Sequence, residues 1–318
     1  MITLLLSLVA CTSARDAVPV VSVQARLFNT ALERADGRAI VVTDLELAEA
    51  FIQDALAQEP SDYSPPPAIR KQADSRTAYG STQVYSFRTE PSKTTTLVFL
   101  SGGAYIYQPT SMHLNFAAEM AERLDAELLL PAHAVAPHAH AEQANAELVK
   151  MYQDVVIQRP EQRIILMGDS SGGGLALSMA QQIQAAGLRP ADFVVMISPW
   201  LDIGMANPEI TPERDAGDFM LDAKALAYVG QVWAGDLALD DPRVSPIYGP
   251  LKGVGELIMV ASDNELFIPD IHLLTQVAEQ QGAIMHYHEY PNLFHDFTVL
   301  GVPESKTSIA DIVADIQE

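Results

Sequence analysis

Short apolar stretches alternate with amphipathic stretches along most of the chain. The apolar stretches predict strands over residues 82–87, 95–100, 127–130, 163–167, 193–197, 256–261 and 284–290. Apolar positions three and four residues apart predict helices over residues 112–124, 141–156, 173–186, 270–280 and 305–316. This alternation favours an α/β fold with a mostly parallel central sheet flanked by helices.

Two regions depart from the alternation. Amphipathic helices are predicted over residues 21–33 and 45–57, before a proline-rich loop. A long excursion then interrupts the later part of the pattern and contains a predicted helix over residues 221–233. Such excursions tend to lie over the carboxyl ends of the strands, where ligands bind. We therefore expect one domain, residues 21–318, with a helical cap made by residues 21–70 and 200–256.

Composition narrows the classes of function. The chain has 318 residues, 48% of them hydrophobic, which excludes a disordered protein. It carries 41 acidic and 19 basic residues, a formal charge of −22. A chain this acidic is a poor partner for nucleic acid or for an anionic lipid surface. We expect the charge to act mainly in solubility.

The first residues form a separate feature. Residues 2–10 are an apolar run, too short to span a bilayer, that leads into Cys11, the single cysteine. Leu8-Val9-Ala10-Cys11 resembles the lipobox of bacterial lipoproteins, although no basic residue precedes it. Residues 1–20 are thus either the signal of an exported lipoprotein anchored at Cys11 or an ordinary N-terminal segment of a cytoplasmic protein.

A candidate nucleophile follows the predicted strand at residues 163–167. The sequence Gly168-Asp169-Ser170-Ser171-Gly172 comes next, and a predicted helix follows at once. This is G-x-S-x-G between a strand and a helix, where a sharp turn exposes the serine above the sheet. We expect Ser170 to be the nucleophile. The alternative is a glycine-rich turn with a serine at the helix start.

A second glycine motif, Ser101-Gly102-Gly103-Ala104, ends the predicted strand at residues 95–100. Here the chain resembles the hormone-sensitive lipase family of α/β-hydrolases (bacterial esterase family IV), which carries H-G-G-G at this place. Ser198-Pro199-Trp200-Leu201-Asp202 and the segment 241–248 (DPRVSPIY) are similar to further motifs of that family. The resemblance implies the α/β-hydrolase fold. It also implies an oxyanion hole made by the backbone amides of Gly103, Ala104 and Ser171.

The same resemblance implies a base and an acid, in that chain order after the serine. The ending Tyr290-Pro291…His295-Asp296-Phe297 resembles the family's segment around its histidine, which makes His295 the base. Glu265 matches the family's acid, with Asp263 as the rival. Asp270 is either the family's second acidic residue or a helix N-cap.

Three departures from the family stand out in the sequence. Ser101 replaces the family histidine, and residues 132–138 (AHAVAPH) keep only Ala-Pro of the D-Y-R-L-A-P-E block. Asp296 replaces the small residue that follows the family's catalytic histidine. These changes surround the candidate catalytic residues without deleting any of them.

Taken together, the residues and the resemblance favour a serine carboxylic-ester hydrolase for small apolar acyl esters. The expected reaction requires no metal or organic cofactor. His138 and His140 lie close in sequence but lack the matching carboxylate pattern of a zinc site. A homodimer is one option for its assembly. The alternatives are a ligand-binding protein of the same fold with impaired catalysis, and an amidase on the same residues. Apolar candidates for the pocket wall or for the core are Leu27, Phe28, Tyr105, Tyr107 and Trp200.

Overall fold

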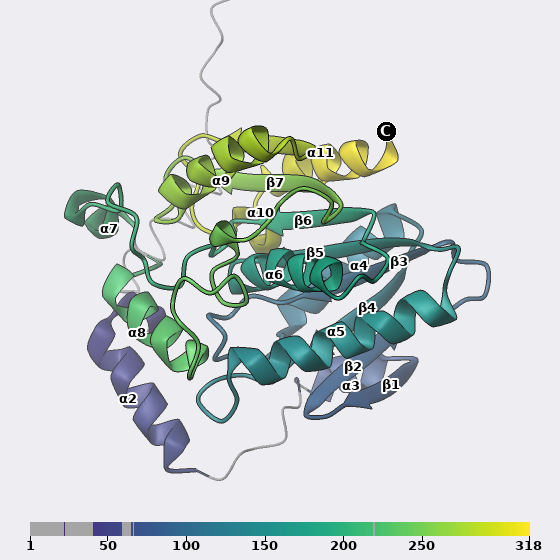
Figure 1. Cartoon of the computed structure of the whole chain (residues 1–318), viewed down its shortest axis with the longest axis horizontal. Coiled ribbons are helices and arrows are strands. Elements are labelled where there is room, and N and C mark those ends of the chain that lie inside the picture. The colour runs from purple at the N-terminus through teal and green to yellow at the C-terminus, as the bar shows by residue number, and fades with distance from the viewer. Residues whose placement is uncertain (1–21, 23–40, 59–64, 66, 219) are drawn as a thin grey trace, which may run out of the picture.

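The computed structural model describes residues 22, 41–58, 65, 67–218 and 220–318 (Figure 1). Its described part contains one sheet of eight strands in the order β1-β2-β4-β3-β5-β6-β7-β8. β2 pairs antiparallel with β1 and β4, and all other pairs are parallel. The mostly parallel sheet is therefore confirmed. The strands are β1 (Ser75–Tyr79), β2 (Thr82–Phe87), β3 (Thr95–Leu100), β4 (Glu127–Ala132), β5 (Arg163–Asp169), β6 (Phe193–Ile197), β7 (Glu256–Ser262) and β8 (Met285–Tyr290).

Helices cover both faces of this sheet. Along the sheet, β4 lies on one side of β3, and β5, β6, β7 and β8 follow one another on the other side. Because parallel crossovers are right-handed, α4 lies on one face while α5, α6 and α9 lie on the opposite face (Figure 1). α10 and α11 pack against α4. Their bounds are α4 (Ser111–Arg123), α5 (Ala141–Gln158), α6 (Ser171–Ala185), α9 (Ile268–Gln281), α10 (Phe297–Leu300) and α11 (Ser305–Gln317).

The central strands are the most apolar because both of their faces are covered. All residues of β4 and β6 are buried, as are all but the first residue of β5 and β7. β1 was not predicted, because its sequence SRTAY is polar and lies exposed at the edge of the sheet. Pro67, the last proline of the proline-rich stretch, begins α3 (Pro67–Gln72), since proline is tolerated in the first turn of a helix.

Two segments distant in sequence pack together beside the sheet. η1 (Val41–Thr43) leads into α2 (Leu45–Leu56), which packs against α8 (Ala223–Ala234) (Figure 1). The N–H of Asp222 donates to the carbonyl of Val42 over 2.9 Å and joins the two segments. A further short helix of the excursion, α7 (Pro212–Gly217), lies apart from α8.

The helices predicted over 45–57 and 221–233 are thus present, each within two residues of its predicted start. The helix predicted over 21–33 and the segment 1–20 with Cys11 lie outside the described residues, apart from Ser22. Among the helices of the described part, none combines the length and apolarity that crossing a membrane requires.

A run of aromatic side chains joins α8 to the sheet. Tyr105 stacks on Trp233 of α8 with ring centres 4.5 Å apart, and its ring centre lies 5.5 Å from that of Trp200. Trp200 in turn stacks on Phe267. All four side chains are buried. Tyr105 and Trp200, which were candidates for the pocket wall, therefore belong to the core.

We expect Trp233→Ala to lower the free energy of unfolding by about 3–5 kcal/mol, because it empties the buried space next to Tyr105. Urea unfolding followed by circular dichroism measures the change. Ile157→Ala is the control, since Ile157 is 69% exposed on α5 and its truncation should cost no more than about 0.5 kcal/mol. Equal losses in the two variants would contradict the central packing role of Trp233.

Candidate active site

A strained turn joins β5 to α6 and holds Ser170. Ser170 has φ 51° and ψ −123°, a backbone conformation that residues other than glycine rarely adopt. It immediately precedes α6, at the positive end of the helix dipole. Ser170 is 9% exposed and lines a pocket. The predicted strand–turn–helix around this serine is therefore present.

Glycines on both sides make the turn possible. A Cβ at Gly168 would lie 2.2 Å from the carbonyl oxygen of Gly172. A Cβ at Gly172 would lie 2.1 Å from the carbonyl oxygen of Leu100. Both contacts are with backbone, which cannot move aside as a flexible side chain could. The two glycines let the turn press against the end of β3.

The structure brings the predicted serine, histidine and acid into one chain of hydrogen bonds. The Ser170 hydroxyl and Nε2 of His295 form a hydrogen bond of 2.9 Å, and Nδ1–H of His295 donates to Oε2 of Glu265 over 2.9 Å. The other carboxylate oxygen of Glu265 accepts from the Ser198 hydroxyl (2.8 Å) and from the N–H of Ser262 (2.7 Å). Glu265 is completely buried. Each oxygen of this buried carboxylate thus has a partner.

The rival acid lies elsewhere. Asp263 is exposed, and its carboxylate accepts from the N–H of Asn292 over 2.6 Å. Asp270 is not an N-cap, because α9 begins at Ile268. Its buried carboxyl accepts from the Asn207 side chain over 2.8 Å. Of the three acids, only Glu265 is in hydrogen-bond contact with His295.

The predicted oxyanion loop lies beside the serine. The N–H of Gly102 donates to the Asp169 carboxylate over 3.0 Å, which ties the loop to the turn at Ser170. Gly103 has φ 122°, so glycine is required there. Within the described part of the chain, the N–H groups of Gly103, Ala104 and Ser171 donate no hydrogen bond. These three donors therefore remain available to an oxygen bound near Ser170.

Ser101 stands where the family has a histidine, and His133 contacts the backbone there. Nothing in the sequence indicates this contact. Ser101 is buried, and its hydroxyl has no hydrogen-bond partner among the described residues. The ring of His133, from the end of β4, contacts the backbone of Ser101 and also reaches the carbonyl oxygen of Ala134 at 2.9 Å. Burial lowers the pKa of His133, although these two backbone contacts oppose the effect. A neutral imidazole from another strand thus braces the loop.

A pocket of about 280 Å³ opens above Ser170. Its wall contains the oxyanion loop, Tyr107, and side chains from the cap region and from α4 and α10. Apart from the polar groups near Ser170, the wall is mainly apolar. Its apolar side chains are Val42, Met112, Met220, Leu221, Leu226 and Leu300.

The part of the pocket wall that comes from the cap region is connected to the loop that carries Glu265. The Asp218 carboxylate accepts from the N–H groups of Met220 and Leu221, which line the pocket. It also accepts from the N–H of Leu266, the neighbour of Glu265, over 2.9 Å. Burial raises the pKa of Asp218. One half-buried carboxyl therefore connects the pocket wall with the neighbour of the residue that contacts His295.

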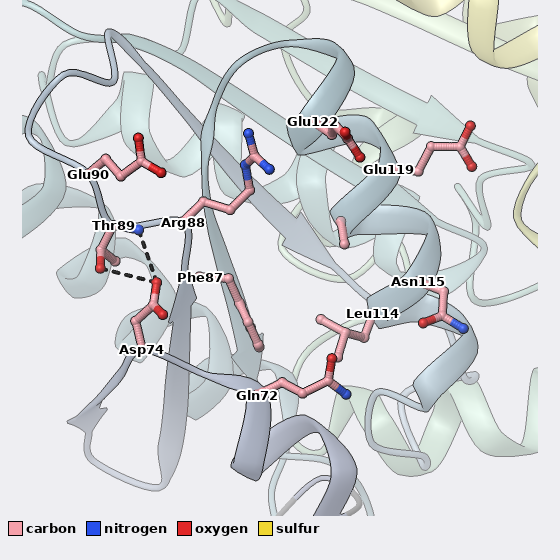
Figure 2. A pocket seen from close by; sticks show the side chains of 11 residues that line it. Gln72, Asp74, Phe87, Arg88, Thr89, Glu90, Leu114, Asn115, Glu119 and Glu122 are labelled. Carbon is pink, nitrogen blue, oxygen red and sulfur yellow. Dashed lines mark hydrogen bonds between the residues drawn. The ribbon is translucent and has the colours of Figure 1, made fainter.

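A larger hollow of about 870 Å³ lies elsewhere, between α3, the end of β2 and α4 (Figure 2). Four acidic side chains, Asp74, Glu90, Glu119 and Glu122, and the single cation Arg88 line it. Asp74 accepts from the N–H and the hydroxyl of Thr89. It shares no residue with the pocket above Ser170 and contains none of the predicted site residues.

Asp296 places a second carboxyl next to the imidazole. Its Oδ2 lies 3.3 Å from Nε2 of His295, the nitrogen that also contacts Ser170. Burial alone would lower the pKa of His295, but the carboxylates of Asp296, Glu265 and Asp218 outweigh it and raise the pKa to about 9. Burial, together with the nearby Asp169 and Glu265, raises the pKa of Asp296 well above the usual carboxyl range. His295 and Asp296 lie so close that the ionisation of each affects the ionisation of the other.

No group of three or more histidine, cysteine or acidic side chains in the described part is arranged to hold a metal ion. His286 and His288, which alternate along β8, pair with Glu256 and Asp315.

We expect His295 to lose its proton at a pH well above the ordinary value, and Asp296→Asn to lower that pH by about one unit or more. The sign follows from charge, because removing a neighbouring carboxylate destabilises the imidazolium. NMR titration of the imidazole nitrogens measures the change. Asp263→Asn should leave the titration unaltered, since Asp263 is exposed and does not contact the ring. An unaltered titration in Asp296→Asn would refute the coupling.

Comparison with known proteins agrees with this architecture. The model of a family described as the α/β hydrolase fold matches residues 97–299. An esterase of Acinetobacter venetianus is 26% identical over 231 residues, which are 71% of this chain and 75% of that protein. An acetyl-hydrolase of Streptomyces hygroscopicus is 29% identical over 204 residues, covering 63% and 67% of the two chains.

A solved structure has the same fold. It is a hormone-sensitive lipase from a metagenome library, with a TM-score of 0.76 and 22% identity, and the match covers 92% of this chain and 97% of that one. The family match and the named relatives confirm the prediction of a carboxylesterase- or lipase-like hydrolase, and the chain belongs to the α/β hydrolase fold family.

Proposed function

We propose that this carboxyl-ester hydrolase works through a Ser170–His295–Glu265 triad and an acyl-enzyme, on small esters with apolar acyl groups. The observation that carries the proposal is the continuous hydrogen-bond chain from Ser170 to Glu265 at the base of the pocket. A hydroxyl in contact with an imidazole, itself oriented by a buried carboxylate, is the arrangement that activates a serine.

The proposed reaction has two halves. His295 Nε2 takes the proton of Ser170 while Oγ attacks the ester carbonyl, and the imidazolium then gives that proton to the leaving alcohol oxygen. Water next loses a proton to Nε2 and attacks the acyl-enzyme, and the Ser170 oxygen leaves with that proton. Glu265 holds the ring orientation and stabilises the imidazolium in both halves.

The developing negative charge on the carbonyl oxygen needs hydrogen-bond donors. The free N–H groups of Gly103, Ala104 and Ser171 support this role, because they lie on the loop and the turn that meet at Ser170. Two of these residues, Gly103 and Ala104, also line the pocket. The glycine at 103 leaves room for a carbonyl to approach the backbone.

The size and polarity of the pocket support small apolar acyl groups. Its volume of about 280 Å³ lies at the low end for small-molecule sites. Its mainly apolar wall would gain about 0.8 kcal/mol for each methylene that it buries, until the space is filled. The name of the Streptomyces acetyl-hydrolase agrees with a small acyl group.

We expect Ser170→Ala to abolish hydrolysis of p-nitrophenyl acetate and Glu265→Gln to lower kcat by about 10³–10⁴-fold. Asp263→Asn is the matched control and should stay within about threefold of wild type. Initial rates measure all four proteins, and a fluorophosphonate should label wild type at Ser170. Equal rates for wild type and Ser170→Ala would remove the hydrolase proposal, and a larger loss in Asp263→Asn than in Glu265→Gln would reassign the acid.

We also expect kcat/KM to rise from acetyl to butyryl p-nitrophenyl esters and to fall by about tenfold or more at dodecanoyl, since a long chain exceeds the pocket. The acyl series from two to twelve carbons measures this limit. Leu226→Ala, which enlarges the pocket at α8, should move the optimum toward longer chains. A flat series in both proteins would show that this pocket does not hold the acyl group.

A further inference from the structure

The end of α7 meets the loop that carries Glu265 at a single peptide unit. The guanidinium of Arg214 donates from Nη1 to the carbonyl oxygen of Glu265 over 3.3 Å. The carboxylate of Asp218 accepts from the N–H of Leu266 over 2.9 Å. This carbonyl and this N–H belong to the same peptide bond, so both of its polar atoms are held. Arg214 and Asp218 together are called the peptide clamp below.

The clamped peptide has few other partners. Within the described residues, the N–H of Leu266 has no acceptor other than Asp218. The carbonyl of Glu265 has one further donor, the N–H of Ile268, at 3.3 Å. Glu265 and Leu266 are both completely buried. Because an unpaired backbone group is costly in a buried place, the backbone of Glu265 depends on the clamp for its position.

Asp218 also joins the clamp to the wall of the pocket above Ser170. Its Oδ2 accepts from Leu266, whereas its Oδ1 accepts from the N–H groups of Met220 (2.9 Å) and Leu221 (3.1 Å). The side chains of Met220 and Leu221 are buried and line the pocket. One planar carboxylate therefore stands between this wall and the backbone of Glu265, and a displacement on one side of it reaches the other.

The segment that carries the clamp is held mainly by polar contacts. No residue of α7 is buried, so hydrophobic packing contributes little to its position. A segment with few buried apolar contacts opens at a low cost in free energy. An acyl group on Met220 and Leu221 would bury apolar surface against this segment, and a ligand that binds one arrangement better raises its population. A filled pocket thereby favours the clamped position of Glu265.

We propose that Arg214 and Asp218 are positioning residues that hold Glu265 against His295, and that an acyl group in the pocket strengthens this hold through Asp218. Neither side chain lines the pocket, so both act through Glu265 and not on the substrate. An acyl group that reaches Met220 and Leu221 then raises kcat as well as lowering KM. This inference rests on the proposed ester hydrolysis.

The test measures kcat and KM for p-nitrophenyl acetate and butyrate in wild type, Asp218→Asn and Arg214→Met. Asparagine has one acceptor oxygen and cannot serve both sides of the former carboxylate, and methionine has no donor. We expect each variant to lower kcat for the butyrate about tenfold or more, while KM changes less than about threefold. The two substitutions change the charge in opposite directions, so charge alone cannot produce a common fall in kcat.

Two further results are expected if the hold on Glu265 is the cause. Arg214→Lys, which keeps a cationic donor, should recover kcat to within about fivefold of wild type. In Asp218→Asn, the ratio of kcat for butyrate to kcat for acetate should fall about threefold or more, because the pocket wall no longer acts on Glu265. Equal losses for the two esters would overturn the proposal.

Asp215 provides the matched control. Its carboxylate accepts from the N–H of Ala223 over 2.8 Å, so it holds the same segment, and among the described residues it makes no hydrogen bond to the loop of Glu265. Asp215→Asn should keep kcat within about threefold of wild type and leave the butyrate-to-acetate ratio unchanged. A loss as large as that in Asp218→Asn would indicate general loosening of the segment and overturn the proposal.

A readout without turnover separates this inference from the proposed function. The proton NMR resonance of Nδ1–H of His295 reports the hydrogen bond to Glu265. It should move upfield in Asp218→Asn and in Arg214→Met, because the bond weakens in both, and stay in place in Asp215→Asn.

The two kinds of failure then look different. If wild type and Ser170→Ala hydrolyse both esters equally slowly, hydrolysis itself fails, and the resonance alone decides whether the clamp holds Glu265. If wild type is active but neither kcat nor the resonance changes in the two clamp variants, the roles of Arg214 and Asp218 are refuted and the proposed hydrolysis stands.

Discussion

The site depends on one close approach between backbones. Where β5 turns into α6, Gly168, Gly172 and the end of β3 at Leu100 come so near that a methyl group on either glycine would overlap a carbonyl oxygen. That contact holds Ser170 in its strained conformation and sets the oxyanion loop beside it, because the loop is the direct continuation of β3. Packing of the surrounding sheet supplies the free energy that keeps the strain in place.

The second constraint is electrostatic. Two carboxyl groups, from Glu265 and Asp296, contact one imidazole in a largely buried space, and Asp169 lines the same pocket. Backbone N–H groups and the Ser198 hydroxyl satisfy two of them. The third, Asp296, lies 3.3 Å from Nε2 of His295. Such a site repels a carboxylate product, which favours release of the acid once water has cleaved the acyl-enzyme.

The sequence was informative where one local pattern determines one structure. Continuous apolar runs marked the buried strands, and a glycine-flanked serine between a strand and a helix marked the turn. β1 was missed because an edge strand exposed to solvent has no apolar signature. Hydrophobicity also could not separate core from pocket, so Tyr105 and Trp200 remained ambiguous until their stacking partners were known.

Contacts between residues distant in sequence could not be predicted either. The brace that His133 gives to the backbone of Ser101 joins residues on two strands, and the sequence shows only the loss of the family histidine. The reach of Asp296 to Nε2 depends on a left-handed backbone angle and on a hydrogen bond to Ser198, neither of which has a local sequence signal. The departure from the family at this residue was visible, but its geometry was not.

The cap and the acid loop share the half-buried carboxyl of Asp218, and this limits how the protein can be modified. The segment at 220–221 lines the pocket, so a new substrate range would have to arise there by exchange or insertion. The same carboxyl also fixes the N–H of Leu266, next to Glu265. The cap is therefore not an interchangeable module, and a grafted cap needs an equivalent acceptor for Leu266 to preserve the position of Glu265.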